Sequence, residues 1–211
     1  MHRIALLLLL LVTFVHADEY DNLRLKFRDI LLGAGYNTAD PNVATRLTSI
    51  ANTANANWAS MDKSPTRTFL WSDYASTTIS AHITNSYSRL LNMAQAYATP
   101  GCSLQGDATM LADIVSGLDW MHANRYGATS VQYDNWWDWE IGSPLRLTDI
   151  CVMLYDQLTP TQRTNYMTAV NFQTPTPDMT QANKVWKARV VGVRGCLVKS
   201  NPKLIGCRNT E

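Results

Sequence analysis

The stretch Asn135-Trp136-Trp137-Asp138-Trp139-Glu140-Ile141-Gly142 contains three of the seven tryptophans of this chain, flanked by amide and carboxylate side chains. The apolar C–H faces of a sugar ring stack on indoles, and the hydroxyl groups at its rim need hydrogen-bond partners. The composition of the stretch is therefore typical of a carbohydrate-binding cleft. Buried tryptophans at the end of a core helix would give the same pattern, and the cluster alone favours neither interpretation.

On both sides of this stretch, apolar residues recur at intervals of three and four positions, the spacing of one helix face, and strand signals are nearly absent. The sequence therefore predicts an all-α fold, and a recurrence of helix pairs at roughly 40–50 residues indicates an array of helical hairpins. The expected helices run up to Gly33, from Asp40-Pro41 through Ala54, from Ile79 to Pro100-Gly101, from Asp107 to Gly127, from Leu147 to Leu158, from Thr159-Pro160 through Val170, and from Val185 to Leu197, with an extended link at 174–177.

Two of these helices are apolar on more than one side, which indicates that neighbours cover them from several directions, as in layered or toroidal helix arrays. One helix follows the tryptophan stretch. In the other, near the C-terminus, Trp186, Val190 and Leu197 form one stripe, while Val185 and Cys196 belong to a second. We expect both stripes to be buried.

Residues 1–17 have the pattern of a signal peptide, with a basic start, an apolar run from Ile4 to Val15, and small residues at the cleavage positions up to Ala17. The run is too short for a comfortable membrane anchor, and no later stretch approaches the roughly 20 apolar residues of a spanning helix. We therefore expect a secreted, extracellular protein that begins near Asp18 and has no membrane partner.

The formal net charge of +1 gives no support to a nucleic-acid-binding protein or to any polyanion binder that acts through bulk charge. An acidic ligand must then be bound by local contacts. No acidic cluster suits a metal, no cofactor is expected, and we expect a monomer. Four cysteines fit an oxidising compartment and allow three complete pairings. Cys151 is expected to be a buried hydrophobe, and Cys196 with Cys207 is the favoured pair.

Two motifs carry a specific resemblance. The first runs from Asn135 to Leu158, and the second is Gln181-Ala182-Asn183-Lys184-Val185-Trp186-Lys187-Ala188. In residues, order and spacing they resemble polysaccharide lyase family 8, which holds the hyaluronate, chondroitin and xanthan lyases. The resemblance implies a partial (α/α) toroid over residues 18–211, the N-terminal portion of such an enzyme, because family members continue with more helices and then β-sheet domains.

The resemblance also implies a reaction, the β-elimination of an acidic polysaccharide at a uronic acid. A base removes the C5 proton beside the carboxylate, and the oxygen on C4 departs. The ionised carboxylate resists further negative charge, so hydrogen-bond donors must neutralise it. The matching residue here is Asn183, whose amide offers two N–H donors and stays neutral. Without the family match, Asn183 would be read as a residue that satisfies backbone groups at a helix start.

For substrate binding, the resemblance points to Trp136 and Trp137 as the aromatic patch, with Asn135 and Arg146 as further contacts, while Trp139 is expected in the core. Two departures leave the substrate preference open: Gln181 replaces a glycine usual in the family, and Leu145 replaces an arginine of several members, with Arg146 beside it.

Other charged residues near the motifs receive structural interpretations. Asp138 and Glu140 could form the acid and base of a hydrolase, but residues two positions apart point in different directions, so we expect both to bind cations or backbone. Lys187, Arg189 and Arg194 either add positive charge to the cleft or form a solvated helix face.

In the family, a histidine and a tyrosine farther along the chain transfer the protons, and this sequence has neither after Asn183. His82 and His122 are expected to be packed or surface histidines. We therefore expect little or no turnover from this chain alone. Three alternatives stay open: a non-catalytic carbohydrate-binding protein, a helical interaction protein with core tryptophans, and a gene model or fragment that is cut short.

Overall fold

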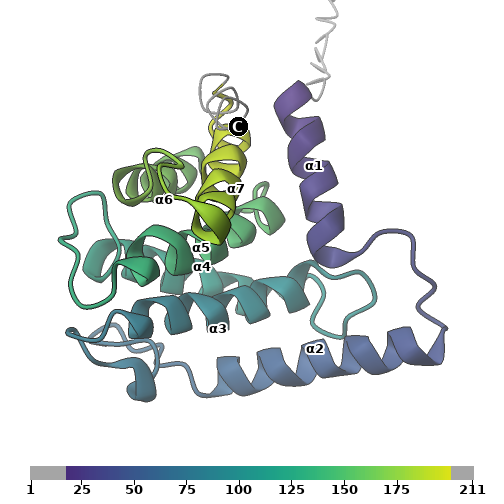
Figure 1. Cartoon of the computed structure of the whole chain (residues 1–211). Coiled ribbons are helices and arrows are strands. Elements are labelled where there is room, and N and C mark those ends of the chain that lie inside the picture. The colour runs from purple at the N-terminus through teal and green to yellow at the C-terminus, as the bar shows by residue number, and fades with distance from the viewer. Residues whose placement is uncertain (1–17, 201–211) are drawn as a thin grey trace, which may run out of the picture.

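The computed structural model describes residues 18–200, and all regular elements within this range are helices (Figure 1). They are α1 (Glu19–Leu32), α2 (Pro41–Ala59), the 3₁₀-helix η1 (Ser72–Tyr74), α3 (Ala81–Ala98), α4 (Ala108–Asn124), the π-helix η2 (Asp138–Gly142), α5 (Ser143–Met153), α6 (Pro160–Gln173) and α7 (Gln181–Leu197). The predicted all-α class is confirmed. The signal peptide and the pairing of Cys196 with Cys207 depend on residues outside the described range.

The helices begin where capping side chains satisfy the free N–H groups of the first turn. The Asp40 carboxylate accepts the backbone N–H groups of residues 42 and 43, and Asp107 accepts that of residue 110. Thr159 and Gln162 form a reciprocal capping box at the start of α6. These three helix starts are the predicted ones, because a capping residue leaves a local pattern in the sequence.

Two central helices organise the packing. α3 contacts α2, α4 and α5, and α5 in turn contacts α1, α6 and α7. Successive helices α2 and α3 lie side by side and run in opposite directions, as a helical hairpin (Figure 1). Among the described residues, no helix is long and apolar enough to cross a membrane.

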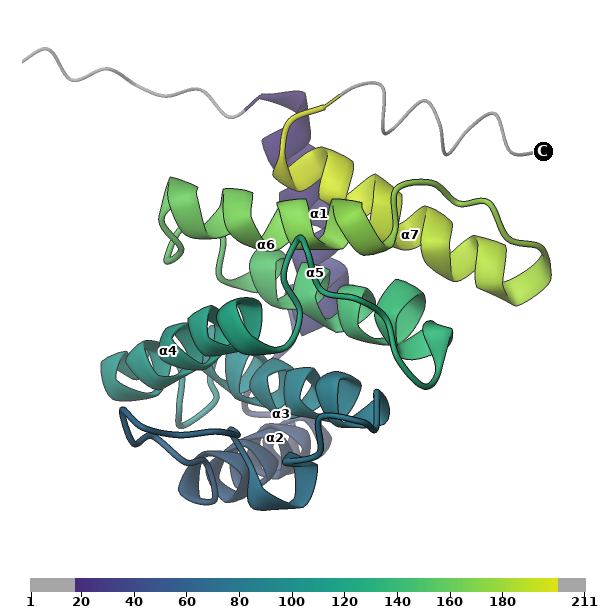
Figure 2. The same ribbon diagram turned by 90° about the vertical axis from the view of Figure 1, so that its left-hand side faces the viewer.

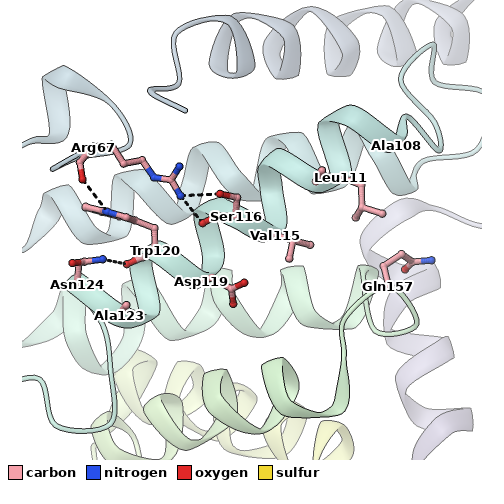
Figure 3. Close-up of a pocket in the computed structure, with 11 residues that line it drawn as sticks. Arg67, Ala108, Leu111, Val115, Ser116, Asp119, Trp120, Ala123, Asn124 and Gln157 are labelled. Carbon is pink, nitrogen blue, oxygen red and sulfur yellow. Dashed lines mark hydrogen bonds between the residues drawn. The ribbon is translucent and has the colours of Figure 1, made fainter. Parts of the chain in front are cut away.

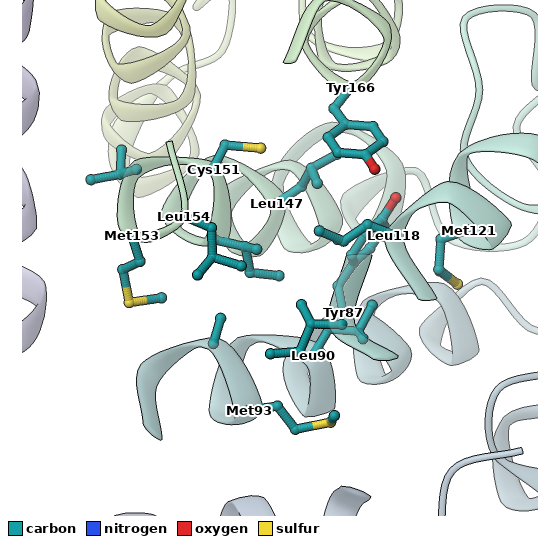
Figure 4. Close-up of a cluster of buried hydrophobic side chains, with 14 of the residues drawn as sticks. Tyr87, Leu90, Met93, Leu118, Met121, Leu147, Cys151, Met153, Leu154 and Tyr166 are labelled. Carbon is teal, nitrogen blue, oxygen red and sulfur yellow. The ribbon is translucent and has the colours of Figure 1, made fainter. Parts of the chain in front are cut away.

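The core lies between α3, α4, α5 and α6, and its side chains interdigitate across the helices that Figure 4 shows. Cys151 on α5 is 1% exposed, and burial raises the pKa of its thiol well above the ordinary value. The prediction that Cys151 is a buried hydrophobe is confirmed. The residues labelled around it are Tyr87, Leu90, Met93, Leu118, Met121, Leu147, Met153, Leu154 and Tyr166.

Helix α7 follows the predicted stripes only in part, because Val190 and Leu197 are buried at 0% and 4% as expected, but its first turns are not. Trp186 is 40% exposed and Val185 is 67% exposed, whereas Lys187 and Arg194 are buried at 1% and 0%. The expected burial of Trp186 and Val185 is therefore wrong, as is the placement of Lys187 and Arg194 in a cleft or on a solvated face. Both cations have acceptors inside the protein, and the apolar pattern of α7 alone does not reveal those acceptors.

Candidate functional site

A buried serine holds the turn that precedes the tryptophan pair. The hydroxyl of Ser80, just before α3, lies 2.7 Å from the Asp138 carboxylate and 3.1 Å from the Asp134 carboxylate, and it accepts the backbone N–H of Asn135 at 3.1 Å. Asp134 has φ +60°, in the left-handed region that Asp tolerates better than most residues. These bonds fix the chain where it enters the motif.

Asn135 is exposed, and its side-chain oxygen accepts the backbone N–H of Trp137 at 3.1 Å. The oxygen is thereby used to hold the start of the following helical turn. The amide N–H groups of Asn135 are the part of the side chain that can bind a ligand, which suits an acceptor such as a carboxylate or a hydroxyl oxygen.

The three tryptophans of the motif have different environments. Trp136 is 40% exposed, Trp137 is half-buried, and Trp139 is 1% exposed. The indole N–H of Trp139 donates to the Tyr133 carbonyl at 2.9 Å, and its ring stacks on Tyr126 with centroids 5.9 Å apart. Trp139 is a core residue, as predicted, and the two preceding tryptophans remain at the surface.

The π-helix η2 places Gly142 directly against the Trp137 ring. A Cβ atom at position 142 would lie 2.5 Å from Cζ3 of Trp137 and 2.8 Å from Oγ1 of Thr84. Only a glycine leaves room for the indole there. The close approach fixes the ring of Trp137 against η2, so its free edge and face point away from the backbone.

Arg146 lies on α5, one turn after Gly142. It donates from Nη1 to the Gly142 carbonyl at 2.8 Å and from Nε to the Ser88 hydroxyl at 2.5 Å. Burial lowers the pKa of Arg146, an effect that the nearby carboxylates of Asp138 and Asp149 oppose. Arg146 and Trp137 thus both contact Gly142, Arg146 through the glycine carbonyl and Trp137 through its ring. Two nitrogens of the guanidinium are already bound within the protein.

Asn183 lies in the first turn of α7 and is half-buried. The helix begins at Gln181, whose φ of +54° is in the left-handed region, where glycine is favoured. The resemblance stated above implies a glycine of the family at this position, and Gln181 here adopts a backbone conformation that glycine favours. Asn183 also lies near free backbone N–H groups, since Thr180 provides no side-chain cap.

Trp186, in the second motif, contacts Trp137 in the first. It follows Asn183 by three residues, so both side chains lie on neighbouring parts of the helix surface. Its ring meets that of Trp137 edge to face, with centroids 6.2 Å apart and planes at 88°. Figure 2 shows the start of α7 and the start of α5, which follows η2, on the same side of the molecule. Sequence reasoning missed Trp186, although its spacing from Asn183 was a usable signal.

The two carboxylates of the motif have partners within the protein. Glu140 forms an ion pair with Lys187 at 2.8 Å, as predicted, whereas Asp138 accepts the Ser80 hydroxyl rather than a cation or a backbone group. Arg189, the remaining cation considered for the cleft, donates to both oxygens of Asp149, at 2.7 and 2.8 Å.

The two described histidines are engaged elsewhere. Nδ1 of His82 accepts the backbone N–H of Ser76 at 3.1 Å, and the ring packs against Tyr74. The His122 ring packs against Tyr166, and burial lowers its pKa. Both are packed histidines, as expected.

A separate cavity of about 720 Å³ runs along the outer face of α4 (Figure 3). Two of its polar side chains bind within the protein: Nη2 of Arg67 donates to the Ser116 carbonyl and hydroxyl, and Trp120 donates to the Arg67 carbonyl. None of the predicted site residues lines this cavity, so the candidate site is the open surface between η2 and α7. The lining residues are Arg67, Ala108, Leu111, Ala112, Val115, Ser116, Asp119, Trp120, Ala123, Asn124 and Gln157.

Residues 27–209 match the family model described as polysaccharide lyase family 8, N terminal alpha-helical domain. The chain belongs to polysaccharide lyase family 8. It is 40% identical to a xanthan lyase of Bacillus sp. strain GL1 over 195 residues, which cover 92% of this chain and 21% of the relative. This polysaccharide lyase family 8 chain thus spans about a fifth of the length of that protein.

Solved lyase structures share the fold. The Paenibacillus xanthan lyase structure matches with a TM-score of 0.89 and 44% identity, over 92% of this chain and 19% of that one. The Streptomyces coelicolor A3 chondroitin AC lyase, solved in complex with chondroitin sulphate, matches with a TM-score of 0.85 and 36% identity, over 90% of this chain and 26% of that one. The family resemblance predicted from the two motifs is confirmed.

Proposed function

We propose that this chain forms the N-terminal toroid portion of a secreted polysaccharide lyase that acts by β-elimination on a uronic-acid polymer of the hyaluronan, chondroitin or xanthan type. The observation that carries the proposal is the contact between Trp137 and Trp186. It joins the tryptophan motif to the first turns of α7, where Asn183 lies, so one surface offers both indoles and an amide.

The roles follow from the chemistry of each group. Trp136 and Trp137 stack on sugar faces, and Trp186 adds a third indole beside them. Asn135 and Arg146 donate hydrogen bonds to the polysaccharide. Asn183 donates to the uronate carboxylate, so that the negative charge that develops when C5 loses its proton is stabilised. Its position in the first turn of α7 adds a favourable helix-dipole contribution of about 0.3–1 kcal/mol for an anion.

In the elimination, a base takes the C5 proton, the C5–H electrons form the C4–C5 double bond, the C4–O bond breaks, and the departing oxygen takes a proton. His82 and His122 are engaged in packing away from α7. We therefore assign binding and charge neutralisation to this chain, and we expect no turnover from it alone.

Secretion is part of the proposal. Residues 1–17 would be the leader, and the domain would start at Asp18. In support, α1 begins at Glu19 with Asp18 as its cap, so removal of residues 1–17 would leave the first helix and its capping side chain whole. Sequencing the N-terminus of the exported protein tests this boundary, and a start later than Asp18 would contradict it.

Incubation of the purified chain with hyaluronan, chondroitin sulphate and xanthan tests the proposal. Calorimetry should detect binding to at least one polymer, without the ultraviolet absorbance of an unsaturated uronide. Trp137→Ala should weaken binding at least about tenfold, because it removes a stacking face. Trp120→Ala, which changes a half-buried tryptophan on α4, should not. Failure to bind any of the three polymers would contradict the proposal.

A second function, carbohydrate binding without catalysis, is favoured by the packing of both described histidines away from Asn183. The two functions differ in what the whole protein does. A longer natural form that binds the polymer and releases no unsaturated product would support the binding protein, whereas product formation would support the lyase.

A further inference from the structure

One buried ammonium group connects the three segments that build the site. Nζ of Lys187, on α7, lies 2.8 Å from Oε2 of Glu140 in η2, and it also donates to the carboxylate of Asp178. Asp178 belongs to the link between α6 and α7, just before the first turn that carries Asn183. Lys187 thus touches the π-helix, the link and the helix at once.

These contacts lie one helical turn from the functional side chains. Lys187 follows Asn183 by four residues, and Glu140 follows Trp137 by three. The link has further anchors: the Thr174 hydroxyl donates to the Glu140 carbonyl at 2.7 Å, and Arg194 donates to the Pro175 carbonyl at 3.1 Å. The relative position of the two motifs therefore depends on contacts that converge on η2.

Burial makes this arrangement specific. Lys187 is 1% exposed, so its charge has little access to water and requires its two carboxylates. A displacement of η2 or of the link would take away one of the two carboxylates that neutralise this buried charge. Buried ion pairs contribute little net stability compared with apolar packing, and their best-attested use is to select one arrangement among several.

We propose that Lys187 is a positioning residue: through Glu140 and Asp178 it sets the orientation of Trp137 and Trp186 relative to Asn183. The inference rests on the proposed function of this surface in binding a uronic-acid chain. Lys187 itself stays under the surface and does not touch the substrate.

The test compares two variants that each remove a cation from α7. Lys187→Met removes the ammonium that pairs with Glu140 and Asp178. The matched control, Arg189→Met, removes the cation that pairs with Asp149 on α5. Two readouts are measured on the full chain: the affinity for a hyaluronan oligosaccharide, and the circular dichroism couplet of the two indoles 6.2 Å apart, assigned with Trp186→Phe.

We expect Lys187→Met to keep its helical signal, lose most of the couplet, and bind at least tenfold more weakly, while Arg189→Met keeps both couplet and affinity. An unchanged couplet in Lys187→Met would overturn the proposal. If Lys187→Met does not fold, Glu140→Gln, which removes one charge and keeps an acceptor, should still reduce the couplet, and an unchanged couplet there would overturn the proposal instead. Absence of binding in the parent would contradict the proposed function, whereas the couplet would still decide the role of Lys187.

Discussion

Trp136, Trp137 and Trp139 belong to one motif, yet only the last is in the core. The chain enters the π-helical turn η2 directly after Trp137, and such turns redirect side chains locally and are frequent at functional sites. Gly142 completes the arrangement, because its missing side chain leaves the space that the Trp137 ring occupies. At the residue scale, the position of the Trp137 ring thus depends on a glycine five positions away.

Gln181 is a second residue whose backbone matters more than its side chain. Its φ of +54° costs a non-glycine residue roughly 1 kcal/mol. Gln181→Gly should therefore raise the free energy of unfolding by about 1 kcal/mol in urea titrations. Gln181→Ala, which keeps a Cβ atom, is the control and should give no comparable gain. A glycine variant no more stable than the alanine variant would show that the position is not strained.

Some residues of the site could be identified from the sequence, and others could not. Asn183 and the Trp136-Trp137 pair could be identified because they lie in motifs of fixed order. Trp186 and Lys187 could not be placed correctly, because an aromatic residue is usually buried and a lysine is usually exposed. Here Trp186 is 40% exposed and Lys187 is 1% exposed, and their partners Trp137 and Glu140 lie 49 and 47 residues away in sequence.

At the element scale, helix α7 illustrates both success and failure of pattern analysis. Its C-terminal end was predictable from local spacing, since it ends at Leu197 as expected, although it begins at Gln181, four residues before the predicted start. The burial of Lys187 and Arg194 was not predictable, because these cations are satisfied by carboxylates and carbonyls on η2 and on the link after α6. The helix starts at Asp40 and Asp107 were predicted correctly, because a capping side chain binds backbone N–H groups within four residues of itself.

The contact between Asp149 on α5 and Arg189 on α7 predicts how the stability of the protein depends on pH. Burial raises the pKa of Asp149 to about 6, although Arg189 and Arg146 oppose the shift. The ordinary value is 3.8, so the folded protein holds this proton more tightly than the unfolded chain does. The contribution of Asp149 to the free energy of unfolding should therefore fall as pH rises from about 4 to about 6, by up to about 3 kcal/mol.

Urea unfolding of the parent and of Asp149→Asn at pH 4 and pH 7 measures this contribution. The asparagine cannot ionise, so the stability of the parent relative to Asp149→Asn should decrease between the two pH values. Other acidic groups change both proteins alike and cancel in the difference. A difference that stays constant, or that grows with pH, would contradict the raised pKa.

At the scale of the whole molecule, α3 and α5 form a centre around which the other helices pack, and the candidate site lies at one end of that packing rather than in the cavity along α4. The fold class was predictable because apolar spacing repeats along the entire chain. The surface between η2 and α7 was predictable only through the family resemblance, since it joins segments that are far apart in the sequence.

The central claim is that Asn183 recognises the carboxylate while the indoles hold the sugar chain. The most direct test compares affinity for a hyaluronan oligosaccharide with affinity for the same oligosaccharide after reduction of its carboxylates to alcohols. The parent should prefer the acidic form by about tenfold or more, as for a hydrogen bond to a charged group. Asn183→Ala should lose this preference and retain binding of the reduced form, whereas Asn52→Ala, on the exposed face of α2, should keep it. An undiminished preference in Asn183→Ala would contradict the account.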